Sequence, residues 1–321
     1  MRKTWINADK SHLWKDDISA SVDQFNQWFM QFAPKAFRST RLKTTTLVKD
    51  ALLATRDLSN LDAPTLKANP SALSTLRMCT APPLAVDRLI GLAHASKNLV
   101  SQMEKGKLPA KMSEADLDDE LRGLCRILAD LLDRDIFPWL GTNKVPAEHE
   151  RDRASTIVAD RLTNALADPE IRNAQERRQL DAIDRLLKDN GYRMEAHPAG
   201  KPLTEMTPGT YCFRLNLFTK KGRGRKIKVP VDAAIQPKRP RADRLPILIE
   251  AKSAGDYTNT NKRRKEEAKK MRQLKDAYGP NVPYVLFLGG YFDGGYLGYA
   301  VTDGFDWVWE HRINDLLNLG L

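Results

Sequence analysis

The feature that most constrains the fold is an apolar run that ends in two charged residues. Residues 245–252 read Leu-Pro-Ile-Leu-Ile-Glu-Ala-Lys, a length and composition typical of a buried β-strand. Because side chains alternate along a strand, Glu250 and Lys252 share one face with Leu248. Charged groups at the end of a buried strand are costly to desolvate unless they are paired or have a task. The run therefore predicts a buried strand that ends in an ion pair or a functional site.

A single acid lies in the predicted strand that comes before this one. Residues 226–235 contain Asp232 within Val-Pro-Val-Asp-Ala-Ala-Ile. If the two strands are neighbours, Asp232 and Glu250 converge on one hard cation such as Mg²⁺, for which Mn²⁺ can substitute, and the Ala251 carbonyl can be a further ligand. Lys252 would then orient the attacking water in phosphodiester hydrolysis or stabilise the charge that develops. An ordinary aspartate and a structural Glu-Lys ion pair remain the alternative at this point.

A third acid could reach the same place from a helix. Glu176, Leu180, Ile183 and Leu187 have the spacing of one helical stripe. An acid on a stripe that packs against the sheet could complete the metal site or bind one of its ligands. It could equally be a glutamate at the edge of the stripe, and periodicity does not separate these two interpretations.

The order of predicted elements indicates an α+β fold in two domains. Residues 1–150 show helical periodicity, with predicted helices at 19–32, 83–102 and 115–135, the last capped by Ser113. Residues 151–321 begin with a helix that Asp168-Pro169 is expected to start. Strands at 211–218, 226–235, 245–252 and 282–288 follow, with a helix at 258–278 and a hairpin turn at 220–226. We therefore expect a helical N-terminal domain and a mixed sheet flanked by helices.

Positive charge is concentrated in one segment. Residues 201–275 hold 21 Lys and Arg against 7 Asp and Glu, a net charge of +14, whereas the rest of the chain is net −3. Such a field favours a polyanion as partner, and the start of the helix at 258–278 would oppose the helix dipole unless phosphate bound there. The residues of this start that we expect to contact double-stranded DNA are Thr258, Asn259, Asn261, Lys262, Arg263, Arg264 and Lys265. A solvated basic turn is the alternative.

Other features bear on the location of the protein. No apolar run approaches the roughly 20 residues that span a bilayer, and residues 1–20 are unlike a signal peptide. The three cysteines, at positions 79, 125 and 212, are too widely spaced for a typical zinc site. We expect a cytoplasmic protein that does not bind membranes and whose cysteines are buried thiols.

The residues resemble a known superfamily. Asp232 followed by Glu250-Ala-Lys252, with a glutamate on a preceding helix, is similar to the PD-(D/E)XK nucleases, although the proline of that pattern lies one place early, at Pro230. That proline is not a ligand. Over a longer part of the sequence, the chain resembles the XamI-type type II restriction endonucleases. The similar stretches are 77–83, 135–140, 173–180, 229–232, 250–256 and 258–267. The resemblance implies a restriction-endonuclease-like catalytic domain in a homodimer that cuts palindromic duplex DNA to 5′-phosphate ends, and it suggests a GTCGAC-like target.

Two rival functions remain at this point. A structure-directed repair or junction nuclease could use the same catalytic groups. A non-catalytic DNA-binding protein could use the basic helix alone, with the acids as structural groups. The shared strand face of Glu250 and Lys252 favours catalysis.

Overall fold

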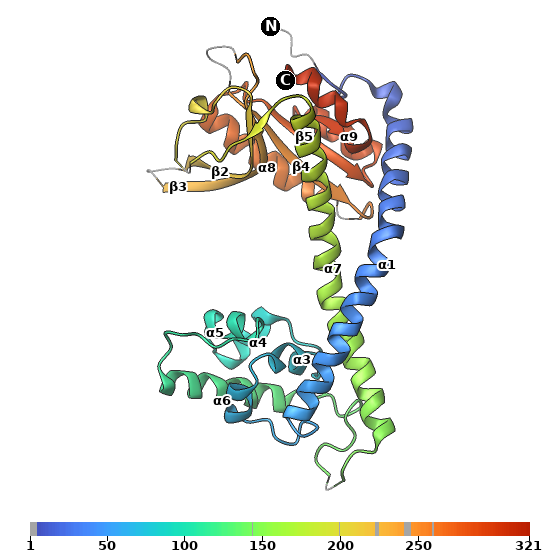
Figure 1. Ribbon diagram of the computed structural model, residues 1–321, viewed down its shortest axis with the longest axis vertical. Helices are drawn as coiled ribbons and strands as arrows, with labels where there is room; N and C mark the ends of the chain where they lie inside the picture. The colour runs from blue at the N-terminus through green and yellow to red at the C-terminus, as the bar shows by residue number, and fades with distance from the viewer. Residues whose placement is uncertain (1–4, 143, 199, 222–224, 241–244, 259) are drawn as a thin grey trace. The chain divides into compact units, whose positions relative to one another are not determined.

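The computed structural model describes the chain except for residues 1–4, 143, 199, 222–224, 241–244 and 259 (Figure 1). The chain divides into two compact units, Met1–Phe32 with Arg172–Leu321 and Ala33–Ile171. Two long helices, α1 (Trp14–Ala54) and α7 (Glu148–Asp189), each have residues in both units. This division differs from the boundary near residue 150 that the sequence favoured, because the N-terminal residues belong with the C-terminal sheet.

The first unit is built on a mixed six-stranded sheet in the order β1-β2-β3-β4-β5-β6. Strands β2, β3 and β4 are antiparallel neighbours, whereas β1 runs parallel to β2, and β4, β5 and β6 run parallel to one another. The strands are β1 (Arg193–Met194), β2 (Thr210–Lys221), β3 (Arg225–Ile235), β4 (Ile247–Ala254), β5 (Tyr284–Gly290) and β6 (Asp306–Trp309). The four expected strands are present, so the α+β class is confirmed.

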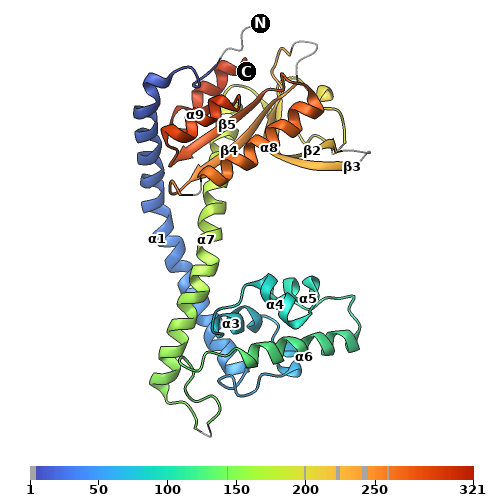
Figure 2. The same cartoon turned by 180° about the vertical axis from the view of Figure 1, so that it is seen from behind.

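Helices cover both faces of this sheet. Figure 1 shows the C-terminal half of α7 in front of it, and Figure 2, from behind, shows α8 (Thr260–Tyr278) and α9 (Gly294–Thr302) on the other side. Leu180, Ile183 and Leu187 of α7 pack with Ile249 and Phe287. On the opposite face, the core unites α8 and α9 with the sheet through Met271, Leu274, Tyr296, Leu297, Leu248, Leu286 and Leu288. The alternation of side chains along β4 and β5 therefore gives each helical layer its own core.

The N-terminal segment is fixed to the last strand by hydrogen bonds. The Asp306 carboxylate accepts the backbone N–H groups of Ile6, at 2.6 Å, and Asn7, at 3.1 Å. The Asn7 amide in turn donates to the Trp307 carbonyl at 2.9 Å. Asp306 is buried, and these backbone donors satisfy its charge. Three hundred residues of sequence separate these partners, so no local pattern could predict their contact.

The second unit is helical. Besides its parts of α1 and α7, it contains α2 (Ala63–Ala68), α3 (Ala72–Met78), α4 (Val86–Ala93), α5 (Lys97–Met103) and α6 (Glu114–Asp130). Ser113 caps α6 as expected, since its hydroxyl accepts the Asp116 N–H at 3.1 Å. The expected helix at 83–102 is instead two helices. The break occurs because His94 adopts a left-handed conformation, with φ at 52°, and the Ser96 hydroxyl caps the next helix.

The prediction that a helix starts at Asp168-Pro169 is wrong, because α7 continues through Pro169 from Glu148. A proline inside a helix removes one backbone hydrogen bond and usually kinks or breaks the helix. Here the residues on both sides are held by burial, with Val158 and Leu162 in the helical unit and Ile183 in the sheet unit. Packing of both flanks outweighs the local signal to begin a new helix.

Two further expectations concern the hairpin and the cysteines. Strands β2 and β3 pair as far as Lys221 and Arg225, as a hairpin at 220–226 requires, while residues 222–224 of its turn lie outside the described residues. All three cysteines are buried free thiols, as expected. Among the helices that the structure describes, every one lacks the uninterrupted apolar length that crossing a membrane requires.

Candidate active site

The pairing of β3 with β4 brings the two predicted acids together. Ala233 of β3 lies opposite Ile249 of β4, and this is the last pair at that end of the β3–β4 ladder. Asp232, the residue before Ala233, lies just beyond it. The Asp232 carboxylate Oδ2 accepts the Ala251 N–H at 2.8 Å. Because Ala251 stands between Glu250 and Lys252, this bond fixes Asp232 beside both of them.

A bend in the β2–β3 hairpin places Asp232 at this position. Arg214, which falls opposite Asp232 between the paired positions 213–233 and 215–231, has φ at 52°, the left-handed region. Side chains of a regular strand alternate, so Phe213 and Leu215 should share one face. They instead pack in opposite cores, Phe213 with α7 and Leu215 with α8. At Arg214, therefore, the side chains of β2 that face the α7 side of the sheet give way to side chains that face the α8 side. This change occurs next to the candidate site.

Glu250 and Lys252 lie on the sheet face that α8 covers. The Glu250 side chain is only 7% exposed, and its Oε1 accepts a hydrogen bond from Lys252 Nζ at 2.8 Å. Its other oxygen, Oε2, accepts one from Lys270 Nζ of α8. A buried carboxylate is stable only when it is paired and hydrogen-bonded. The two ammonium groups meet this requirement.

The surroundings of Asp232 and Lys252 shift the pKa of each side chain. Burial, and then the negative charge of Glu250, raises the pKa of Asp232 to about 6. For Lys252, burial opposes the positive charge, but the charge of Glu250 and its hydrogen bond outweigh burial and raise the pKa. Asp232 therefore titrates closer to neutrality than an ordinary aspartate, beside a lysine that keeps its proton.

The oxygen donors fit a small divalent cation. Mg²⁺ is usually bound through one or two carboxylates and keeps several waters, and Asp232 and Glu250 are two carboxylates joined through one backbone unit. In the described part of the chain, no group of three or more acidic, histidine or cysteine side chains could hold a metal ion. A cation at this site would therefore take these two acids and water, with a backbone carbonyl such as that of Ala251 as a further donor.

A comparison with known proteins identifies the family. The model of the XamI restriction endonuclease family matches residues 56–309, well over half of the chain. The chain belongs to the XamI restriction endonuclease family. It is also 53% identical over 311 residues to the type II restriction enzyme SalI of Streptomyces albus G, covering 97% of this chain and 98% of that one. The resemblance to the XamI-type endonucleases seen in the sequence is thereby confirmed, and the enzyme is a restriction endonuclease.

One solved structure is weakly similar. The crystal structure of protein VC1899 from Vibrio cholerae aligns with 78% of this chain at 14% identity and a TM-score of 0.28. The chain spans about half, 54%, of the length of that protein. A similarity this low carries no argument about the fold or function of this XamI-family chain.

Glu176 lies on α7, on the opposite side of the sheet from α8. Its Oε1 is 3.1 Å from Arg214 Nη2, and its side chain is 43% exposed. Arg214 is the residue that falls opposite Asp232 in the hairpin. The structure therefore links Glu176 to the strand position beside the site through an arginine, while the apolar part of the expected stripe is buried.

The basic start of α8 is only partly described. Asn259 lies outside the described residues, as do the side chains of Asn261, Lys262 and Arg263. Thr258 and Lys265 are exposed. Arg264 lies over the Tyr299 ring of α9, with its guanidinium carbon 4.0 Å from the ring centre.

Four residues near the site were missed by the sequence reasoning. Lys270 could have been found, because it borders the buried positions Glu267, Met271 and Leu274 of α8. The other three, Arg178, Gln179 and Glu310, form a largely buried network. Glu310 is 131 residues from Gln179 in the sequence, so no local signal connects it to this helix.

This network lies on the α7 face of the sheet, opposite the face that holds Glu250 and Lys252. The Gln179 amide donates to the Lys252 carbonyl and to Glu310 Oε2, both at 3.3 Å. Arg178 Nη2 is 2.6 Å from Glu310 Oε1, and Glu310 is 4% exposed. Gly289 of β5 leaves room for the carboxylate, since a Cβ there would lie 2.3 Å from Glu310 Oε2. The network thus holds the backbone of β4 at Lys252, the lysine of the candidate site.

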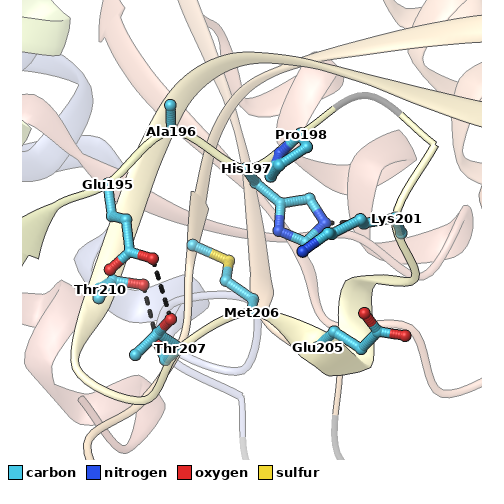
Figure 3. A pocket seen from close by; sticks show the side chains of 9 residues that line it. All are labelled: Glu195, Ala196, His197, Pro198, Lys201, Glu205, Met206, Thr207 and Thr210. Atoms are coloured by element: carbon cyan, nitrogen blue, oxygen red, sulfur yellow. Dashed lines mark hydrogen bonds between the residues drawn. The ribbon is translucent and has the colours of Figure 1, made fainter.

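A small cavity lies elsewhere in the first unit, beside the loop that follows β1 (Figure 3). It has a volume of about 90 Å³. Its polar groups bond to one another: the Thr207 hydroxyl donates to Glu195 at 3.0 Å, and the His197 ring lies 3.2 Å from the Lys201 carbonyl. None of the predicted catalytic or DNA-binding residues lines it, so the cavity is distinct from the candidate active site.

Proposed function

We propose that this chain is a type II restriction enzyme that hydrolyses double-stranded DNA at a specific sequence, uses Mg²⁺ and leaves 5′-phosphate ends. The family match and the relative named as a type II restriction enzyme support this class of enzyme. One observation supports the location of the site above all others. The Asp232 carboxylate is bonded to the backbone between Glu250 and Lys252, on the adjacent strand.

Each of these residues has a proposed role. Asp232 and Glu250, with the Ala251 carbonyl, would hold Mg²⁺, for which Mn²⁺ can substitute. When bound, the cation neutralises charge on the scissile phosphate and acidifies a water molecule. Lys252 orients the attacking water and donates to the phosphate oxygen on which charge develops. Both roles suit an ammonium group that already lies 2.8 Å from Glu250.

Glu176 has a more distant proposed role. Its ion pair with Arg214, at 3.1 Å, favours a part in orienting the residues around Asp232 over direct cation binding. The apo geometry of such an exposed pair can change when substrate binds. Glu176 therefore stays a candidate for completing the site in the DNA complex.

We further propose that the catalytic unit has the PD-(D/E)XK fold. The antiparallel strands β2, β3 and β4 followed by parallel β5 and β6, with one acid on β3 and the Glu-x-Lys pair on β4, support this assignment. On this basis the proposed task of the sheet unit, which holds residues 172–321 of the expected domain 151–321, is catalysis. The helical unit, which holds residues 33–150 of the expected domain 1–150, would provide dimer or DNA contacts.

The proposed partner is duplex DNA, bound by a homodimer. The basic start of α8, residues 258–265, would contact phosphates or base edges. Two-fold symmetry of a homodimer would match a palindromic target, for which GTCGAC-like sequences are the first to test. We place the enzyme in the cytoplasm, where cellular DNA is accessible and buried free cysteines persist.

Cleavage of a plasmid of known sequence tests this proposal. We expect Asp232→Ala, Glu250→Ala and Lys252→Ala each to lower cleavage with Mg²⁺ by about 1,000-fold or more, while DNA binding in Ca²⁺ is retained. Asp181→Ala and Lys105→Ala remove exposed charges and serve as controls that should cut normally. Cleavage by the three site variants at the wild-type rate would refute the assignment of the site.

The pattern of products tests the rival functions. Discrete fragments from linear duplexes, with ends that map to one sequence, indicate a sequence-specific enzyme. Cutting that requires junctions or damaged DNA would indicate a structure-directed nuclease. Absence of nicking by the wild type with Mg²⁺ or Mn²⁺ across varied DNAs would indicate a DNA-binding protein without catalysis.

A further inference from the structure

Helix α8 brings a second lysine to the glutamate of the proposed site. Lys270 Nζ donates to Glu250 Oε2, while Lys252 Nζ donates to Glu250 Oε1 at 2.8 Å. The Lys270 side chain is 16% exposed and that of Glu250 is 7% exposed. Both oxygens of the carboxylate are therefore paired with an ammonium group in a largely buried position.

Lys270 is held in this position by the packing of α8. Its neighbour Met271 is buried in the core between α8 and the sheet. One turn earlier, Glu267 accepts a hydrogen bond from the Tyr296 hydroxyl of α9 at 2.5 Å. This buried bond fixes α8 against α9 and so fixes the direction in which Lys270 extends. A lysine that only covered the surface would gain little from an ion pair and would stay in water.

The position of Lys270 conflicts with the proposed binding of a cation. A divalent cation held by Asp232 and Glu250 needs a free carboxylate oxygen, and Oε2 of Glu250 is occupied by the Lys270 ammonium. A divalent cation and an ammonium group on the same oxygen repel each other strongly at short distance in a buried site, so binding of one disfavours the other. In the absence of the cation, however, a positive group there reduces the repulsion between Glu250 and Asp232.

We propose that Lys270 is a positioning residue that takes the place of the divalent cation on Glu250 Oε2 in the metal-free enzyme and is displaced when the cation binds. This inference rests on the proposed function, because it takes Glu250 as a metal ligand. It assigns to α8 a task at the catalytic centre in addition to contact with DNA. Lys270 keeps the two acids in place before the cation arrives and lowers the affinity for the cation.

Binding of Mn²⁺ to the DNA-free enzyme, measured by isothermal titration calorimetry, tests the competition. We expect Lys270→Met to bind Mn²⁺ about tenfold more tightly than the wild type, the size of a typical coupling between two ligands of one protein. Lys269→Met makes the same charge change at an exposed position of the same helix and should change the affinity by less than about twofold. Lys270→Arg retains the positive charge and should restore an affinity close to that of the wild type.

A second measurement uses the wild-type enzyme, so it does not depend on whether a variant folds. Acetylation of lysines, quantified by mass spectrometry, should increase at Lys270 when Mn²⁺ is added, because the displaced ammonium group leaves its buried pair. Acetylation at Lys269 should stay constant. If the Met variant does not fold, Lys270→Gln replaces it in the binding experiment, with the same expected direction.

The outcomes separate this inference from the proposed function. Equal Mn²⁺ affinity in Lys270→Met and Lys269→Met, or no change in Lys270 acetylation, overturns the displacement of Lys270. If Glu250→Ala at the same time loses both cleavage and Mn²⁺ binding, the proposed site still stands. If Glu250→Ala cuts and binds Mn²⁺ as the wild type does, the proposed site itself fails.

Discussion

The two faces of the central sheet are covered in the same way but differ in what they bury. The α7 face packs Ile183 and Leu187 on Ile249, and it also buries the ion pair of Arg178 with Glu310, which is linked through Gln179 to the backbone of β4. The α8 face also has an apolar core, which includes Leu248 and Leu286. Next to this core lies Glu250, paired with Lys252 and Lys270. Buried charges rarely stabilise a fold more than apolar residues of the same size would. The difference indicates that the α7 face maintains the sheet, whereas the α8 face carries chemistry at some cost in stability.

The largest effect should come from removing one charge on the α8 face. Glu250→Gln keeps the size of the side chain and an acceptor oxygen but removes the negative charge that the proposed cation needs. We expect cleavage to fall about 1,000-fold or more, equivalent to about 4 kcal/mol of transition-state stabilisation. Steady-state cleavage of a plasmid measures it, with far-UV circular dichroism to show that the variant is folded. A loss of less than tenfold would contradict the contrast between the faces.

A buried apolar residue on the α7 face should show the opposite pattern. Ile183→Ala leaves a cavity under the sheet, and we expect the free energy of unfolding to fall by about 3 kcal/mol. Cleavage by the remaining folded molecules should stay near the wild-type rate at low temperature. Urea denaturation measures the stability, with Asp181→Ala, at an exposed position of the same helix, as control. Loss of cleavage without loss of stability would show that the α7 face also takes part in the reaction.

Asp232 should reduce the stability of the metal-free enzyme at neutral pH. Its folded pKa of about 6 exceeds its ordinary value of 3.8, so the folded state binds the proton more tightly than the unfolded state does. The stability that this group contributes is fully present below about pH 4 and is lost as the pH rises through about 6. With chelator present, we expect Asp232→Asn to be more stable than the wild type by up to about 3 kcal/mol at pH 8.

The pH dependence provides the control for this prediction. The advantage of Asp232→Asn should shrink as the pH falls from 8 toward 4, and thermal unfolding at several pH values measures this trend. Added Mn²⁺ should stabilise the wild type and not the variant. An advantage that stays constant with pH would mean that the effect does not come from the carboxylate charge.

The smallest effect should come from the hydrogen-bond network between α7 and the site. Gln179→Ala removes the amide that donates to the Lys252 carbonyl and to Glu310, and we expect a loss of about 1 kcal/mol in stability. Cleavage should fall by less than about tenfold, because only the backbone that carries Lys252 is loosened. Arg177→Ala, an exposed position of the same helix, is the control. A loss as large as that of Glu250→Gln would mean that the α7 face belongs to the active site.

Much of the sheet could be predicted from the sequence because its signals are local. The apolar run at β4 and the alternation around Glu250 and Lys252 specify a buried strand and a shared face. The Ser113 cap of α6 was recognisable for the same reason, since donor and acceptor lie three residues apart. The Asp168-Pro169 signal was also local, yet it failed, because packing of both flanks of α7 outweighed it.

The sequence by itself determined the chemical groups, their strand and the face on which two of them lie, since side-chain alternation depends only on backbone geometry. Tertiary structure alone decided how β3 meets β4, which sets Asp232 against the Ala251 N–H. It alone brought Lys270 to Glu250 and Glu310 to Gln179. These contacts join residues that are far apart along the chain, and their formation depends on how whole layers pack, which no short window of sequence encodes.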